Sequence, residues 1–193
     1  MIKDLNTLSP LLIVGATACL VLLVDVFSRR TKDSPSGHLG WLNALGNLLA
    51  FGLIVRKWTW GGIALTSPFL RTLITADLYA LFLWGGIALF VAFASLSSVG
   101  YDRENRLHHG EYYSLLSLAG LGMMLMVSAI DLVVFFIALE TMSLAIYALV
   151  AMKRFSSRSA EAGLKYFFAG GLASAFMLYG IALVWGEVGR TDY

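Results

Sequence analysis

Six long apolar segments constrain the fold of this chain more than any other feature of its sequence. Each segment has roughly the 20 mostly apolar residues that an α-helix needs to cross the hydrocarbon core of a bilayer. Helices suit that environment because they satisfy their backbone hydrogen bonds internally. We therefore predict an all-α fold, a polytopic transmembrane helix bundle that forms one domain. The predicted spans are residues 8–27, 39–55, 73–98, 113–130, 132–152 and 162–185.

The composition agrees with a membrane protein. Charged residues make up 13% of the chain, whereas a soluble domain has about 25%. The second span is short, and it carries two polar residues, Asn43 and Asn47. The 56–72 segment is predicted to be an interfacial connection that can hold a small hairpin. Small residues at Gly85-Gly86, Gly120 with Gly122, and Gly170-Gly171 are expected to allow close helix approach.

The Lys and Arg residues of the loops predict an orientation. The loops after the first, third and fifth spans hold eight of these residues, and the termini and the other loops hold five. Cytoplasmic loops carry the excess of positive charge in membrane proteins. Both ends of this chain are therefore predicted to lie on the outer, periplasmic side.

Glu140 is the residue that points most directly to a function. It lies near the middle of the fifth span, where an acidic side chain costs roughly 2.5–3.5 kcal/mol on insertion scales. Ionisable residues at that depth usually face a bundle interior or a water-filled path. Ser143 and Tyr147 follow on the same helical face, which predicts one polar stripe. Proton or ion handling is the first hypothesis, and a structural carboxyl bonded to a neighbouring helix is the alternative.

Lys165 is the second candidate. With a sixth span that begins at residue 162, Lys165 lies about 6 Å inside the cytoplasmic end, whereas Glu140 lies about 18 Å from that end. The offset of about 12 Å is too large for a direct salt bridge. Either water and hydroxyl groups link the two side chains, or each has another partner. Lys165 alone can also extend to the interface.

Other polar residues near the helix ends have simpler explanations. Asp25 precedes Arg29 by four residues, which predicts an interfacial ion pair. Asp77 and Asp131 stand where the third and fifth spans begin, so we expect dipole or capping roles. Ser159 is the predicted cap of the sixth helix.

The three histidines do not indicate a metal or haem site. His38, His108 and His109 all fall in polar loops, so no span offers a pair of axial haem ligands. We interpret His108-His109 as part of a solvated loop. The chain is expected to bind no cofactor.

Three stretches of the sequence carry a resemblance to a known family. The residues 131–144, followed by 161–167 and 174–180, resemble the antiporter-like membrane subunits of respiratory complex I. Within that family they are most similar to subunit N of the bacterial NADH-quinone oxidoreductase. The resemblance implies that Glu140 is the acid of a proton half-channel and Lys165 its cytoplasm-side lysine.

The resemblance also implies a longer protein. The sequence covers under half of a usual family member and stops after the sixth span. The seventh span, with the lysine that is thought to pair with Glu140, is absent. We therefore expect a truncated product or one part of a longer subunit.

On this resemblance the expected function is that of a proton-translocating membrane subunit of NADH-quinone oxidoreductase, in the bacterial inner membrane. NADH, quinone, FMN and iron-sulfur clusters would be bound by partner subunits. The expected partners are neighbouring antiporter-like and small membrane subunits and the lipid bilayer, and no nucleic acid. One alternative is a subunit of a multisubunit cation/proton antiporter or a membrane-bound hydrogenase. The other is a membrane scaffold that transports nothing.

Overall fold

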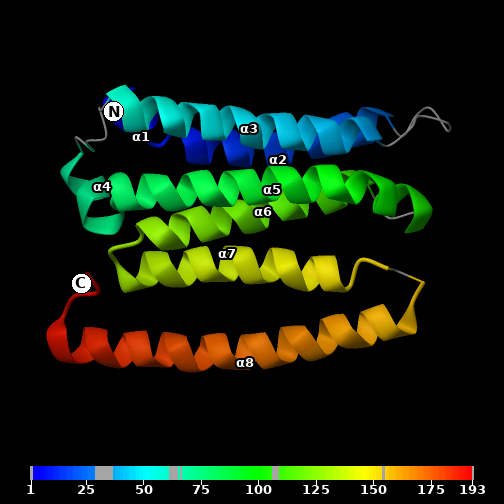
Figure 1. Ribbon diagram of the computed structural model, residues 1–193. Helices are drawn as coiled ribbons and strands as arrows, with labels where there is room; N and C mark the ends of the chain where they lie inside the picture. Colours follow the sequence, from blue (N-terminus) through cyan, green and yellow to red (C-terminus); the bar gives the residue numbers. More distant parts are fainter. Residues whose placement is uncertain are drawn as a thin grey trace.

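The computed structural model describes residues 2–28, 37–60, 65, 67–105, 109–153 and 155–192, and within these residues every regular element is helical (Figure 1). Six of the helices are long and apolar enough to cross a membrane. The predicted all-α, six-span, multi-pass membrane fold is therefore confirmed. The helices are α1 (Ile2–Thr7), α2 (Ser9–Ser28), α3 (Gly37–Trp60), α4 (Pro68–Leu73), α5 (Leu78–Asn105), α6 (His109–Ser128), α7 (Leu132–Val150) and α8 (Ser157–Val188).

The axes of the six long helices are roughly aligned, and successive helices alternate in direction (Figure 1). Both ends of the chain lie at the same end of the bundle. We call this end, at which α2, α5 and α7 begin, the terminal end. Helices α2, α3, α5 and α6 pack against one another, and α7 packs against α6. Helix α8 lies at the edge of the bundle beside α7 and exposes most of its surface.

The core of the first four spans is centred on Trp84 of α5. Its side chain is fully buried, and the indole Nε1 donates to the Met124 carbonyl and the Ser128 hydroxyl of α6, both at 2.9 Å. A buried indole N–H needs such partners because water cannot reach it. This contact fixes α5 against α6 near the terminal end.

The second span is longer than predicted, because both of its asparagines form hydrogen bonds to other helices inside the bundle. Asn43 Nδ2 donates to Ser95 Oγ at 2.8 Å, and Asn47 Nδ2 donates to Ser117 Oγ at 3.0 Å. The Ser117 hydroxyl in turn donates to Asn43 Oδ1 at 2.7 Å. All four side chains are fully buried. Polar side chains that bond across helices hold membrane bundles together, so this cluster joins α3 to α5 and α6.

The third span begins five residues later than predicted. The short helix α4 ends at Leu73, and a non-helical segment separates it from α5. Asp77 accepts a hydrogen bond from the Ala80 N–H at 2.8 Å, as the predicted capping role requires. Of the 56–72 segment, the described residues include the end of α3 and most of the short helix α4, and the predicted small hairpin falls largely on residues outside the described ones.

The sixth span begins five residues earlier than predicted, and its cap is a different serine. Ser156 has an extended backbone, and its Oγ accepts from the Ser159 N–H at 3.3 Å. Ser159 lies inside the first turn and donates instead to the Val150 carbonyl at 2.7 Å. The capping prediction for Ser159 is therefore wrong. The predicted ion pair between Asp25 and Arg29 falls partly outside the described residues, because Arg29 is not among them. His108 also lies outside the described residues.

The small residues differ in how closely neighbouring helices approach them. A Cβ on Gly122 would lie 2.6 Å from the Met142 backbone nitrogen, so α6 and α7 meet almost backbone to backbone. A Cβ on Gly120 would lie 2.7 Å from Val91. Gly86 and Gly171, by contrast, would meet no described atom within 4 Å. Both Gly120 and Gly122 are thus used for close packing, whereas Gly86 and Gly171 are the open members of the other two predicted pairs.

Candidate functional site

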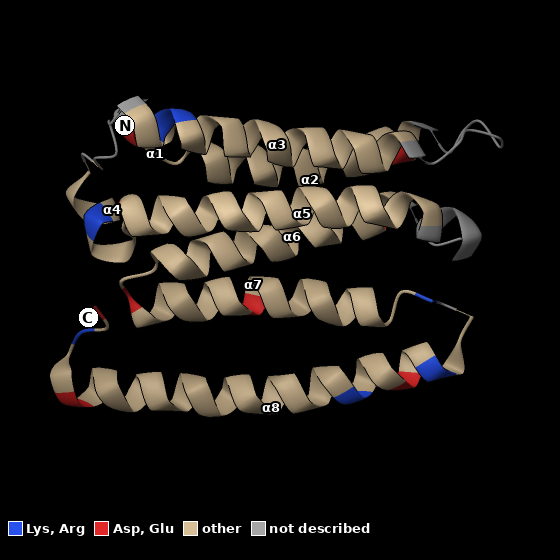
Figure 2. Cartoon of the chain, viewed as in Figure 1, with Lys and Arg blue, Asp and Glu red and all other residues tan. Residues whose placement is uncertain are grey.

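Glu140 lies midway along α7. It is the ninth of the 19 residues of this helix, so it stands about 12 Å from the helix start. Figure 2 shows that most charged positions lie towards the helix ends, with one acidic position at the middle of α7. Asp131 caps the helix through hydrogen bonds from the N–H groups of Val133 at 2.8 Å and Val134 at 3.1 Å. The cap predicted for the fifth span is confirmed.

Asp131 also ties the end of the chain to the start of α7. The Thr191 hydroxyl donates to its second carboxylate oxygen at 2.5 Å, and the Leu132 N–H donates to the Thr191 carbonyl at 2.9 Å. Burial opposes ionisation of this carboxyl, but the hydrogen bonds from Thr191, Val134 and Val133 outweigh it and lower the pKa of Asp131. The segment after α8 is thereby held beside the start of α7.

Glu140 has a hydrogen-bond partner on the next helix. The hydroxyl of Ser174, on α8, donates to a carboxylate oxygen of Glu140. Both residues are half-buried in the seam between α7 and α8. Ser174 is not among the site residues predicted from the sequence. Its signals in the sequence are a small hydroxyl residue within an apolar span and its place at the start of the 174–180 stretch that carries the family resemblance.

Tyr147 sets the position of α8 beside this pair. Its buried ring packs edge-on against Tyr166, with centroids 4.9 Å apart, and against Phe167 at 5.8 Å. A Cβ on Gly170 would lie 1.8 Å from the Tyr147 hydroxyl, so only glycine leaves room for this ring. Gly170 precedes Ser174 by one helical turn. The two ends of the polar stripe predicted from Glu140 to Tyr147 therefore contact α8, Glu140 at Ser174 and Tyr147 at Gly170.

Lys165 lies on the other side of α8. It precedes Ser174 by nine residues, which is about two and a half helical turns. The two side chains therefore point in opposite directions from the helix axis and lie about 14 Å apart along it. Its Nζ lies 2.5 Å from Glu161 Oε1, and these two side chains are 76% and 64% exposed. The sequence predicted either a link between Lys165 and Glu140 through water and hydroxyl groups or a separate partner for each. The structure has the second arrangement, with Lys165 on Glu161 and Glu140 on Ser174. It does not bring Lys165 and Glu140 together.

The chemistry available at the seam is proton transfer between oxygen atoms. A carboxylate that accepts from a hydroxyl can take up a proton and then donate to the same hydroxyl, because a serine Oγ both donates and accepts. Within the described residues, no group of three or more His, Cys, Asp and Glu side chains is placed to hold a metal ion.

Comparison with known proteins supports the resemblance seen in the sequence. A family model described as "NADH:quinone oxidoreductase/Mrp antiporter, TM" matches residues 129–193, which include Glu140, Lys165 and Ser174. NADH-quinone oxidoreductase subunit N 1 of Sorangium cellulosum is 35% identical over 95% of this chain and 38% of its own length. Subunit N 1 of Rhizobium meliloti is 38% identical over 100% of this chain and 38% of its own length. The resemblance to subunit N is confirmed. The chain spans well under half the length of these subunit N relatives.

Two solved structures share the fold. A chain of respiratory complex I from Thermus thermophilus, solved with bound Aureothin, is 28% identical with a TM-score of 0.72, over 95% of this chain and 38% of that chain. A chain of the membrane-bound sulfane sulfur reductase, an archaeal respiratory membrane complex, has a TM-score of 0.74 at 20% identity, over 98% of this chain and 38% of that chain. The second likeness shows the fold alone.

Proposed function

We propose that this chain acts within a proton-translocating membrane subunit of NADH-quinone oxidoreductase, and that Glu140 takes up and releases the proton. The observation that carries the proposal is the hydrogen bond from Ser174 to the Glu140 carboxylate at the middle of a membrane span. The names of the subunit N relatives support the same assignment. An acid at this depth is costly and is usually retained for a function.

In the proposed mechanism Ser174 stays bonded to Glu140 in both protonation states. The hydroxyl donates to the charged carboxylate and accepts from the neutral acid. Lys165 is the second proton carrier, on the opposite side of α8, where Glu161 holds it. A proton that passes between Glu140 and Lys165 must travel about 14 Å along α8, through water or hydroxyl groups.

The proposal places the redox chemistry in other subunits. NADH, quinone, FMN and iron-sulfur clusters are bound by partner subunits, and quinone reduction there is coupled to proton transfer here. The partners are neighbouring antiporter-like and small membrane subunits in a bacterial inner membrane. The terminal end faces the outer side, which the distribution of Lys and Arg among the loops supports.

A second candidate is a subunit of a cation/proton antiporter or of a related membrane complex. The description of the matching family model names Mrp antiporters as well as the oxidoreductase. The test is the set of subunits that purify with the natural protein. NADH-oxidising subunits support the first candidate, and their absence from an otherwise intact complex supports the second.

The test of proton transfer uses Glu140→Gln in the natural, full-length subunit. We expect the complex to assemble and to lose most of its coupled proton pumping, because the amide cannot exchange a proton. Glu187→Gln is the matched control, since Glu187 is an exposed residue near the end of α8. Undiminished pumping in the Glu140→Gln complex would refute the proposal. Loss of assembly in that variant, with the Glu187→Gln complex intact, would favour a scaffold role.

A further inference from the structure

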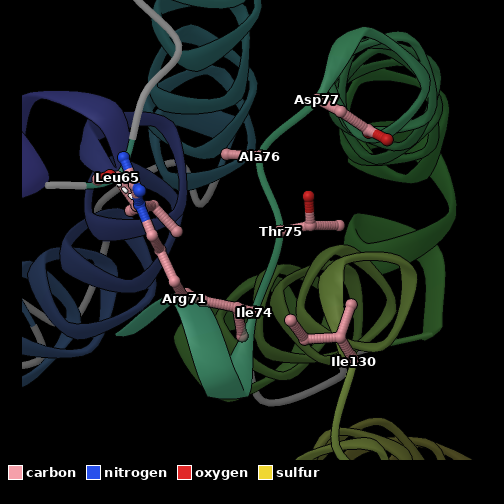
Figure 3. Close-up of a pocket in the computed structure, with 7 residues that line it drawn as sticks. All are labelled: Leu65, Arg71, Ile74, Thr75, Ala76, Asp77 and Ile130. Carbon is pink, nitrogen blue, oxygen red and sulfur yellow. Dashed lines mark hydrogen bonds between the residues drawn. The ribbon is translucent and has the colours of Figure 1, made fainter. Parts of the chain in front are cut away.

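A pocket of 420 Å³ opens at the terminal end of the bundle, between α4, the segment that leads to α5, and the turn between α6 and α7 (Figure 3). It lies far from the seam that holds Glu140, which is midway along α7. Its polar lining comes from Arg71, Thr75 and Asp77, and its apolar lining includes Leu65, Ile74 and Ile130.

The two charged residues of this pocket are not paired with each other. Arg71 Nε donates to the Leu65 carbonyl at 2.5 Å, which positions the guanidinium and leaves its two terminal nitrogens available. In the described part of the chain, neither Arg71 nor Asp77 forms an ion pair. Figure 3 shows the two side chains on opposite sides of Thr75. The pocket therefore presents a cation and an anion that are separated from each other.

The polar groups of the pocket are only partly used by the protein. Asp77 accepts one hydrogen bond, at Oδ1 from the Ala80 N–H, and Oδ2 stays available. The Thr75 hydroxyl has no hydrogen-bond partner among the described residues, although its backbone N–H donates to the Ser128 carbonyl at 2.7 Å. Among the described residues, no side chain or backbone group occupies the terminal nitrogens of Arg71, the Thr75 hydroxyl or Asp77 Oδ2, so these groups can contact a ligand.

The surroundings of the pocket place it at the level of lipid headgroups. It lies where α5 and α7 begin, at the ends of the membrane spans. Next to it, Phe69 of α4 is 69% exposed and Tyr79 of α5 is 68% exposed. Aromatic side chains gather at the membrane interface. A ligand in the pocket therefore has apolar surface beside it on which acyl chains can lie.

We propose that this pocket binds the headgroup of a zwitterionic aminophospholipid, with its phosphate on Arg71 and its ammonium group on Asp77. An Arg fork suits phosphate, because two N–H groups can donate in parallel. The Thr75 hydroxyl is a further donor to the phosphate. A headgroup without a cation would leave the Asp77 carboxylate unpaired beside the bound phosphate. Aminophospholipids are thereby favoured over phosphatidylglycerol.

The experiment measures which lipids stay on the assembled complex after reconstitution in nanodiscs with equal amounts of phosphatidylethanolamine and phosphatidylglycerol. Native mass spectrometry then counts the lipids that survive detergent washing. We expect Arg71→Gln to lower retained phosphatidylethanolamine at this site about tenfold, as loss of a charge-assisted phosphate contact should. Arg56→Gln is the control, because it removes an exposed cation at the same end of the bundle outside the pocket. It should leave retention unchanged.

Asp77→Asn tests the ammonium site independently of the phosphate site. Asparagine also caps helices, so this variant should keep α5 intact even if Arg71→Gln disturbs folding. We expect it to retain lipid but to lose the preference for phosphatidylethanolamine. Unchanged retention in Arg71→Gln, or unchanged preference in Asp77→Asn, would overturn the proposal. Displacement of the lipid by an equal concentration of inorganic phosphate would also overturn it, since the site would then bind a soluble anion.

Discussion

Ser174 of α8 donates a hydrogen bond to the carboxylate of Glu140 at the middle of α7. This contact gives the membrane-embedded acid a partner that serves both of its protonation states. It also couples the acid to α8, a helix whose other contacts in the bundle are few. Any change in the packing of α8 against α7 should therefore alter proton transfer at Glu140.

Loss of the Ser174 hydroxyl should slow proton transfer. A hydrogen bond to a charged group contributes about 1.5–3 kcal/mol, so we expect Ser174→Ala to lower the pumping rate about tenfold or more. Ser174→Thr keeps the hydroxyl and should restore most of the rate. Gly171→Ala is the control on the same helix, because no described atom lies within 4 Å of the added methyl group. Equal rates in the alanine and threonine variants would show that the hydroxyl is not used.

A side chain at Gly170 should separate α8 from α7. A Cβ there would lie 1.8 Å from the Tyr147 hydroxyl and 2.6 Å from its Cζ, so the ring must move. We expect Gly170→Leu to destabilise the assembled complex by about 1–3 kcal/mol, as overpacking does. The measurement is the thermal unfolding midpoint of the purified complex. Tyr147→Ala, combined with Gly170→Leu, should recover part of the loss, and no recovery would contradict this contact.

The Asp131–Thr191 contact should make stability depend on pH. The hydrogen bonds lower the pKa of Asp131 below its ordinary value of 3.8. Because the folded pKa lies below the unfolded one, the stabilisation is present above about pH 4 and is lost as the pH falls through the folded pKa. We expect Thr191→Val to be less stable than the natural protein at pH 7 by about 1–2 kcal/mol. Unfolding measured at pH 7 and in acid should show this difference shrink in acid, and a difference that is constant with pH would contradict the assignment.

The Asn43 cluster should contribute strongly to the stability of the first four spans. Asn43→Leu removes the donor to the Ser95 hydroxyl and the acceptor of the Ser117 hydroxyl, and the loss of these buried hydrogen bonds should cost about 1–3 kcal/mol. Thr141→Val is the control, because the Thr141 hydroxyl bonds only to the Ile137 carbonyl of its own helix. Chemical denaturation of the two variants should separate them, and equal stability would show that the cluster contributes little.

The spans and the depth of Glu140 could be predicted from the sequence because they follow from hydrophobic length, which is a local property. The contact of Glu140 with Ser174 could not, since it depends on how two helices are rotated about their axes. The same limit applies to Lys165. Its offset along the membrane follows from residue counting alone, but its direction, away from α7, depends on the close approach of Gly170 to Tyr147. The cap of α8 was assigned to Ser159 instead of Ser156 because two serines three residues apart both suit a helix start.

The central claim, that Glu140 changes its protonation state during turnover, can be tested by infrared difference spectroscopy of the assembled complex. The account predicts a carboxyl band that appears on protonation, is sensitive to deuterium exchange, is absent from the Glu140→Gln complex and is shifted in Ser174→Ala. A difference spectrum that is the same in the natural and Glu140→Gln complexes, both active in quinone reduction, would contradict it.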